Sequence, residues 1–397
     1  MTDFSATKEM FYLPEGMIYL DGNSLGPLPK ATEARVARTV TAEWGEKVIT
    51  GWNRAGWMAQ PTELGDRIGR LIGAEPGHVV LGDTLSIKVY QALAAAIDLV
   101  PDRKVILTDS GNFPSDIYMA EGLIKSLGHG HELRVVDPED VANHINEDLA
   151  VLMLTQVDYR TGRLHDMADL TAKAHAVGAV ASWDLAHTAG AMAVDLQGCK
   201  ADFAVGCTYK YLNAGPGAPA FIYVAPRHID NCQPALSGWL GHEAPFAFDL
   251  DYRPGTGIER MRVGTPSILQ MAALDASLDI WDQVDMDALR TASIVLTEQF
   301  IAGVEARCPQ LILASPRDPN KRGSQVSFAF EHGYAAMQAC IARNVIGDFR
   351  APDIMRFGFC PLFIDAGDVA AAVDVIADVM ENSLWDDPAF KQVARVT

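Results

Sequence analysis

An acid and a lysine stand at the ends of two short apolar runs near the middle of this chain. Asp184 follows the run Val177–Trp183, and Lys210 comes shortly after the run Ala201–Cys207. Both runs are typical of buried strands, and a charge at the end of such a strand is costly unless something there needs it. A pyridoxal phosphate (PLP) site needs this pair. Its lysine forms a Schiff base with the cofactor, and its carboxylate keeps the pyridine nitrogen protonated.

The surroundings of both residues favour this chemistry over simpler readings. A lysine after a strand is usually a surface residue, but aromatic residues flank Lys210, and a glycine-rich loop that would let backbone approach a phosphate follows it. Asp184 belongs to the sequence Asp-Leu-Ala-His, which taken alone is equally a helix cap with a nearby histidine, His187. Only the presence of Lys210 favours a cofactor site over a helix cap at Asp184.

Three further features match a planar, anionic cofactor and a carboxylate substrate. Phe113 follows an apolar run and has the shape to stack on a ring, although an aromatic residue there is more often core. Hydroxyl and backbone groups near Ser86, at a predicted helix start, form an anion site or merely a cap. Arg356 ends a β-like run and suits a bidentate carboxylate clamp, with a surface ion pair as the alternative.

Composition bounds the class of protein. The chain has 397 residues, 49% of them hydrophobic and 21% charged, which is ordinary for a folded enzyme of two domains. The net charge of −19 and the absence of a basic run disfavour a nucleic-acid partner. Six scattered cysteines without a C-x-x-C pair, no signal-peptide pattern and no long apolar run predict a cytoplasmic protein that does not span a membrane.

The middle of the chain alternates strand and helix patterns. Apolar runs without alternation predict a mostly parallel, seven-stranded sheet flanked by helices, in an α/β fold. The predicted strands are His78–Leu81, Lys104–Thr108, Glu132–Val136, Ala150–Thr155, Ala179–Trp183, Phe203–Cys207 and Ala220–Val224. The predicted helices are Ser86–Leu99, Ser115–Leu127, Asp166–Val177 and Glu139–Asn146. After about residue 270 the pattern predicts a smaller α+β domain, with strands at Gln325–Phe330 and Ile354–Phe359 and helices at Ile268–Val284 and Gly367–Asn382.

Short motifs along nearly the whole chain resemble those of the kynureninase family. They are Leu20–Gly26, Phe113–Asp116, Trp183–His187, Thr208–Gly215, Gly238–His242 and Arg350–Pro352 with Arg356–Gly358. The resemblance implies a fold type I PLP enzyme with three parts. These are an N-terminal segment (1–50) packed on the small domain and active site, a large PLP-binding domain (51–270) and a small C-terminal domain (271–397). It also implies hydrolysis of L-kynurenine to anthranilate and L-alanine in tryptophan catabolism, by a homodimer with shared active sites.

The resemblance also implies a role for each matching position. Lys210 carries the cofactor, with Tyr209 and Asp184 as further catalytic residues. The remaining cofactor contacts fall at Leu85, Ser86, Phe113, Ser115, Asp116, Thr155, His187, Trp239 and Thr265, with Trp239 supplied by the neighbouring subunit. Arg356 binds the substrate carboxylate, with Asn23, Ser24, Trp52 and Gly264 as further substrate contacts. No metal is expected, since the pair His129 and His131 matches no usual zinc spacing.

Two positions indicate the preferred substrate, and two alternatives remain open. Animal-type members, which favour 3-hydroxykynurenine, have Gly-His and Ser-Asn where this chain has Gly51-Trp52 and Gly264-Thr265. The tryptophan removes a group able to bond the ring hydroxyl and adds bulk, which favours L-kynurenine. The alternatives are a cysteine desulfurase-like enzyme of the same group and a PLP-binding protein without turnover.

Overall fold

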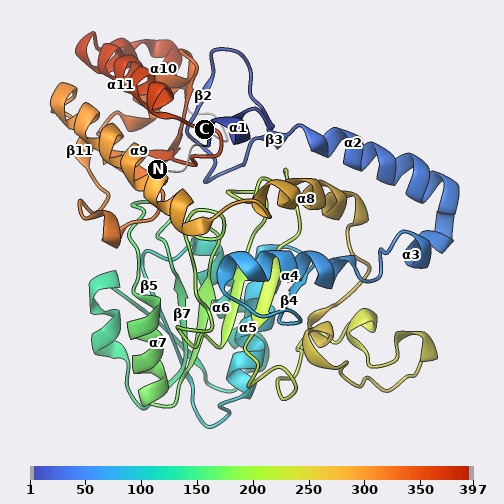
Figure 1. The fold of residues 1–397 in the computed structure, drawn as a ribbon. Helices are drawn as coiled ribbons and strands as arrows, with labels where there is room; N and C mark the ends of the chain where they lie inside the picture. Colours follow the sequence, from blue (N-terminus) through green and yellow to red (C-terminus); the bar gives the residue numbers. More distant parts are fainter. Residues whose placement is uncertain (1–3, 393–397) are drawn as a thin grey trace.

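The computed structural model describes residues 4–392, and a seven-stranded sheet organises its larger part (Figure 1). The strand order is β4-β10-β9-β8-β7-β5-β6, and all neighbours are parallel except β10, which is antiparallel to β4 and β9. The strands are β4 (Val79–Leu81), β5 (Val105–Asp109), β6 (Glu132–Val136), β7 (Leu149–Thr155), β8 (Val180–Asp184), β9 (Phe203–Gly206) and β10 (Phe221–Val224). The predicted mostly parallel sheet of the α/β fold is therefore confirmed.

Helices cover both faces of this sheet, which explains why its strands are apolar without alternation. Buried side chains on one face, such as Ile106 and Val151, pack with α5 (Leu85–Asp98) and α6 (Pro114–Leu127). Neighbours such as Leu107 and Leu152 point to the other face, towards α4 (Gln60–Ile72), α7 (Met167–Ala176) and α8 (Ile268–Trp281). Every residue of β7, β8 and β9 is buried. Packing on both faces therefore fixes the positions of the carboxyl ends of β7, β8 and β9.

One predicted helix is wrong. The segment Glu139–Asn146 forms no α-helix; it holds the 3-10 helix η3 (Pro138–His144), which begins at a proline and is capped by Asp137. Only one residue of η3, Val141, is buried, so this segment lacks the apolar face that stabilises an α-helix. Two segments that contain several glycine and proline residues also hold short regular elements. Gly16–Pro29 holds β2 (Ile18–Tyr19) and β3 (Leu28–Pro29), and Pro254–Pro266 holds the 3-10 helix η6 (Gly257–Met261).

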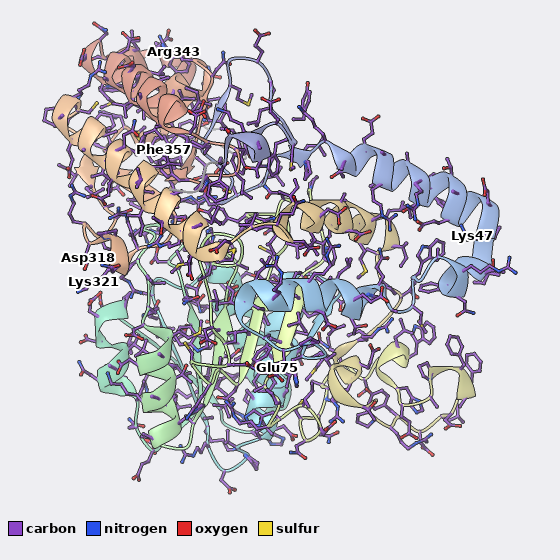
Figure 2. The ribbon with its side chains drawn as sticks, in the orientation of Figure 1. Lys47, Glu75, Asp318, Lys321, Arg343 and Phe357 are labelled. Atoms are coloured by element: carbon purple, nitrogen blue, oxygen red, sulfur yellow. The ribbon has the colours of Figure 1, made fainter. Side chains whose placement is uncertain are left out.

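The C-terminal part forms a smaller α+β unit around a second sheet. Its order is β11-β12-β15-β14, with α9 (Met286–Arg307), α10 (Gly333–Ile341) and α11 (Ala366–Glu381) packed beside it. Figure 2 shows Phe357 inside this unit, where it is buried against Phe300. The strands are β11 (Ile312–Leu313), β12 (Gln325–Ala329), β14 (Asp348–Arg350) and β15 (Ile354–Gly358).

The N-terminal segment joins this smaller unit to the lysine loop. β2 pairs with β13 (Val345–Ile346), and Gly358 N–H donates to the carbonyl of Leu20. A few residues later, Gly26 N–H donates to the carbonyl of Tyr209 at 2.8 Å. A Cβ on Gly26 would lie 2.3 Å from the Lys210 carbonyl, so only glycine permits this approach. The segment therefore holds Asn23 and Ser24 between the small sheet and Lys210.

A helical arm follows the N-terminal segment and was not predicted. It comprises α2 (Ala31–Arg38), the π-helix η1 (Thr39–Gly45), the 3-10 helix η2 (Val48–Thr50) and α3 (Gly51–Arg54). The arm projects from the body in Figure 1, and Figure 2 places Lys47 near its outer turn. Arg35 ties it to α8 through Asp275 at 2.8 Å. The helix α2 has only eight residues and buries none of them within one chain, so it is too short for its periodicity to identify it.

Candidate active site

Lys210 and Asp184 come together because β8 and β9 are adjacent and parallel, so their carboxyl ends meet at one edge of the sheet. Asp184 is the last residue of β8, and Lys210 lies on the turn that follows β9. The amine of Lys210 lies 3.0 Å from Nε2 of His187 and 5.9 Å from the ring centre of Phe113. These residues form the base of the candidate site.

Two buried carboxyl groups face this lysine. Burial raises the pKa of Asp184 to about 6, against the opposing effect of the Lys210 charge. Burial, and then repulsion from Asp184, raises the pKa of Asp116 well above its ordinary value. The only hydrogen bond described for the Asp184 carboxylate comes from the N–H of Ala186, at 2.8 Å. A cationic ring nitrogen placed between these groups would compensate their charge, so they fit a pyridinium.

His187 is held as a neutral ring in the same place. Burial, followed by the charges of Lys210 and Arg356, lowers the pKa of His187 well below its usual value. Its Nδ1 atom is buried without a hydrogen-bond partner among the described residues. Because a neutral imidazole carries one donor and one acceptor, His187 can accept from Lys210 and still offer a donor. It therefore can orient a planar group without adding charge.

An anion cradle lies where two helices begin. Leu85 starts α5, and the helix α6 starts directly after Phe113; neither helix has a side-chain cap on its first N–H groups. The hydroxyls of Ser86 and Ser115, one from each helix, are 2.8 Å apart. Two uncapped N-termini and two hydroxyls at one point are the donor set that a phosphate requires.

Phe113 and Thr155 are two further predicted cofactor contacts near Lys210. The ring of Phe113 is 42% exposed and meets the edge of Tyr159 with 5.1 Å between ring centres. Thr155 ends β7 and is in register with Asp184 on β8. Its hydroxyl donates to the carbonyl of Val157 at 3.2 Å. The predicted cofactor contacts on the large sheet therefore converge around Lys210.

Arg356 is anchored from several sides. Its Nε donates to Asp348 at 2.7 Å, one terminal nitrogen donates to the Tyr159 carbonyl at 2.6 Å, and the other donates to the hydroxyl of Ser24 at 2.6 Å. A second guanidinium, that of Arg350, donates to the same Asp348 carboxylate at 2.7 Å. The two arginines hold the pKa of Asp348 below its ordinary value although burial opposes them. Two cations on one carboxylate leave a net positive charge that suits an anionic substrate group.

Other buried polar groups gather beside this arginine. Asn23 is fully buried, and neither polar atom of its side chain has a partner within the described chain. Burial, and then repulsion from Asp348, raises the pKa of Asp21 to about 8. Unpaired buried amides are costly, so a polar ligand that bonds Asn23 would remove that cost. The predicted substrate residues Asn23, Ser24 and Arg356 thus lie together.

Sequence reasoning missed three members of this cluster. Asp348 and Arg350 stand two residues apart on β14, on one face, and Asp348 is in register with Arg356 on β15. The spacing of Asp348 and Arg350 is visible in the sequence, but the pairing of β14 with β15 could not be predicted from it. Tyr159 lies on the loop after β7, and only the packing of the small sheet against that loop brings its carbonyl to Arg356.

Four predicted residues do not join the cluster within one chain. Trp239 is 44% exposed and contacts only Phe246 among aromatic partners in the described chain, with 5.8 Å between ring centres. Gly264 and Thr265 are exposed. Trp52 lies on the arm and packs against Trp57. No described hydrogen bond or ring contact links these residues to Lys210.

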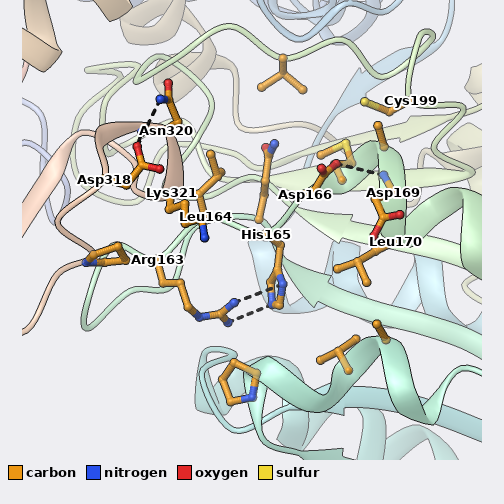
Figure 3. A pocket seen from close by; sticks show the side chains of 18 of the residues that line it. Arg163, Leu164, His165, Asp166, Asp169, Leu170, Cys199, Asp318, Asn320 and Lys321 are labelled. Carbon is orange, nitrogen blue, oxygen red and sulfur yellow. Dashed lines mark hydrogen bonds between the residues drawn. The ribbon is translucent and has the colours of Figure 1, made fainter.

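A cavity of about 900 Å³ lies elsewhere, between the α7 region and the segment around Asp318 (Figure 3). Figure 3 shows Arg163 directed at both ring nitrogens of His165, with distances of 3.2 and 3.0 Å. His165 in turn lies 2.5 Å from Asp109, at the end of β5. No predicted cofactor or substrate residue lines this cavity, so it is separate from the site around Lys210.

The fold defines the class of protein. The structure resembles an apo cysteine desulfurase from Thermococcus onnurineus NA1, with a TM-score of 0.80 and 18% identity over 96% of this chain and 99% of that one. It is also similar to the cysteine desulfurase CsdA from Escherichia coli, with a TM-score of 0.79, 17% identity and coverage of 96% and 99%. The chain therefore has the fold type I architecture that these enzymes share. Among the described helices, none is long and apolar enough to cross a membrane.

Sequence comparison gives the family. The profile of the kynureninase C-terminal domain matches residues 289–376. A kynureninase from Burkholderia pseudomallei (strain 1106a) is 49% identical over 98% of this chain and 95% of its own. A kynureninase from Pseudomonas fluorescens is 48% identical with the same coverage. The chain belongs to the kynureninase family.

Proposed function

We propose that this protein binds PLP at Lys210 and hydrolyses L-kynurenine to anthranilate and L-alanine. The observation that carries the proposal is the convergence of Lys210, the buried carboxyls of Asp184 and Asp116, and the anchored Arg356 at one edge of the sheet. Membership of the kynureninase family supports the choice of reaction. The free state of all six cysteines supports a cytoplasmic location.

The arrangement assigns each residue a task in the reaction. When bound, PLP supplies a protonated ring that accepts the electron pair of the substrate Cα–H bond. Asp184 holds the proton on the ring nitrogen, Arg356 binds the substrate carboxylate, and Lys210 takes the proton from Cα. Water then adds to the γ-carbonyl carbon, and the Cβ–Cγ bond breaks with its electron pair on Cβ. A proton delivered to Cβ and the return of a proton from Lys210 to Cα complete alanine, and the other fragment leaves as anthranilate.

Tyr209 is the proposed donor of the proton to Cβ. Tyr209 adjoins Lys210. The charge of Cys207, followed by burial, holds the pKa of the Tyr209 hydroxyl above the usual range, so the hydroxyl keeps its proton until Cβ accepts it. We expect Tyr209→Phe to lower kcat for L-kynurenine by about 10²–10³. Exchange of the alanine Cα hydrogen in D₂O depends on Lys210 instead and should persist. Full turnover by Tyr209→Phe would refute the role.

The aryl end of the substrate is assigned to Trp52, Gly264 and Thr265. All three lie outside the single-chain cluster, and Trp52 is on the projecting arm. We expect Trp52→His to raise the ratio of kcat/KM for 3-hydroxykynurenine over L-kynurenine by about tenfold, since one added hydrogen bond gives that discrimination. Steady-state kinetics on both substrates measure it. Trp44→His on the same arm is the control, and an unchanged ratio in Trp52→His would contradict the assignment.

We infer a homodimer that completes each site across its interface. Large apolar side chains are exposed on the segment that carries Trp239, where Phe246 is 63% and Phe248 is 77% exposed. The arm adds Trp44 and Ile49, which are also exposed. Exposed apolar groups of this size are typical of an interface between protein chains. Contact between two copies would cover them and bring Trp239 of one subunit to the phosphate site of the other.

The two alternative functions predict different results in one assay. A cysteine desulfurase needs an accessible thiol of low pKa, but burial raises the pKa of both Cys340 and Cys360 to about 12. Purified protein with PLP should release fluorescent anthranilate from L-kynurenine and no sulfide from L-cysteine. Release of sulfide would favour the desulfurase, and binding of PLP without either product would favour a non-catalytic PLP protein.

A further inference from the structure

A fully buried lysine, Lys88, stands in α5 two residues after Ser86 of the anion cradle and takes no part in the reaction as derived. It sits one turn into α5, and its side chain has no exposed surface. Its ammonium lies 2.9 Å from Gln91 Oε1, 3.3 Å from Asp83 Oδ2 and 3.3 Å from the carbonyl of Met261. All three neighbours are acceptors, and an ammonium group has three donors. The contacts therefore match the charged form of Lys88.

The positive charge of Lys88 lies near the N-terminus of α5, where a cation is unfavourable unless an anion binds beside it. The N-terminus of a helix carries a partial positive charge, which disfavours a cation nearby. Three other helices around the sheet place an acid in the first turn, which is Glu63 in α4, Asp116 in α6 and Asp169 in α7, whereas α5, like α8, has none. Burial also lowers the pKa of Lys88, with Asp83 opposing the change. Asp83 offsets part of this cost, but its side chain is one-third exposed.

Lys88 also joins two parts of the predicted site. Asp83, in the left-handed region with φ of 57°, belongs to the turn that leads into Ser86. The Met261 carbonyl closes η6, three residues before Gly264, and it also accepts from Gln91 Nε2 at 3.2 Å. The ammonium thus links the turn before α5 to the segment that carries Gly264 and Thr265.

We propose that Lys88 is a positioning residue whose buried charge strengthens binding of the PLP phosphate at the N-termini of α5 and α6. The inference rests on the proposed function, because it needs PLP at Lys210. Lys88 does not reach the cofactor itself. It raises the positive potential behind the uncapped N–H groups of α5 and fixes the turn that presents them.

The test compares PLP with pyridoxal, which lacks the phosphate but forms the same bond with Lys210. Dissociation constants are measured on the full-length protein, freed of cofactor, by absorbance and tryptophan fluorescence. We expect Lys88→Gln to weaken PLP binding roughly tenfold or more and to change pyridoxal binding less than threefold. The control Gln91→Met removes the other bond to the Met261 carbonyl and one acceptor of Lys88, but it keeps Lys88 with Asp83 and the Met261 carbonyl, and it should leave the PLP-to-pyridoxal ratio unchanged.

A merely structural role for Lys88 predicts a different pattern. Equal weakening of both ligands, or no weakening of either, in folded Lys88→Gln would overturn the proposal. Should that variant not fold, as judged by circular dichroism, Lys88→Met, whose side chain has a similar length without the charge, carries the same comparison, and Lys88→Arg should restore the PLP preference. Failure of the wild-type protein to bind PLP at Lys210 would instead refute the proposed function.

Discussion

Lys210→Ala should lower kcat for L-kynurenine by at least about 10³, because it removes both the covalent attachment point and the base that takes the Cα proton. The phosphate cradle at Ser86 and Ser115 remains intact, so the variant should still bind PLP non-covalently. Its absorbance spectrum should then be that of the free aldehyde at every pH. The measurement is single-turnover and steady-state anthranilate release.

The control for this variant is a lysine with no role at the site. Lys173 is exposed on α7, and its one ion pair among the described residues is with Asp169, at 2.5 Å. Lys173→Ala should retain the wild-type kcat. Retention of more than a few per cent of kcat by Lys210→Ala would mean that another group is the base.

Asp184→Asn should lower kcat by about 10²–10³, because the amide keeps the size of the side chain but loses the charge that holds the ring nitrogen protonated. In the protein without cofactor, burial raises the pKa of Asp184 to about 6, so the carboxyl is ionised at about pH 8. A cationic ring would lower that pKa. Steady-state kinetics and the absorbance spectrum of the bound cofactor report the loss.

Asp184→Glu is the matched control for charge. It keeps the carboxylate while displacing it by one methylene, so it should recover part of the activity that Asp184→Asn loses. Activity in Asp184→Asn within threefold of the wild type would contradict the electrostatic role of this residue.

The large sheet was predictable because its strands are buried on both faces. Runs such as Val151–Leu154 have no polar position, and each predicted strand of the large sheet overlaps an observed one with ends shifted by at most one residue. The arm was not predictable from periodicity. Its helix α2 has only eight residues, which is shorter than the window in which helical periodicity is recognised, and polar contacts such as Arg35 with Asp275 hold it.

Some residues of the candidate site could also be predicted from the sequence, and others could not. Asp184 and Lys210 were found because both follow strands of one sheet, and strand ends alone bring them together. Asp348 was missed because its contact with Arg356 depends on how two strands of the small sheet pair. Tyr159 was missed because its contact depends on how the two sheets pack. The roles of Trp52, Trp239, Gly264 and Thr265 stay predictions, since they need a second copy of the chain.

The most direct test of the account is to reduce the PLP-loaded protein with borohydride, digest it and map the pyridoxyl group by mass spectrometry. The account predicts a single modified peptide that carries the group on Lys210, and no modification when Lys210→Ala is treated in the same way. A pyridoxyl group on another side chain, or on none, would contradict the central claim.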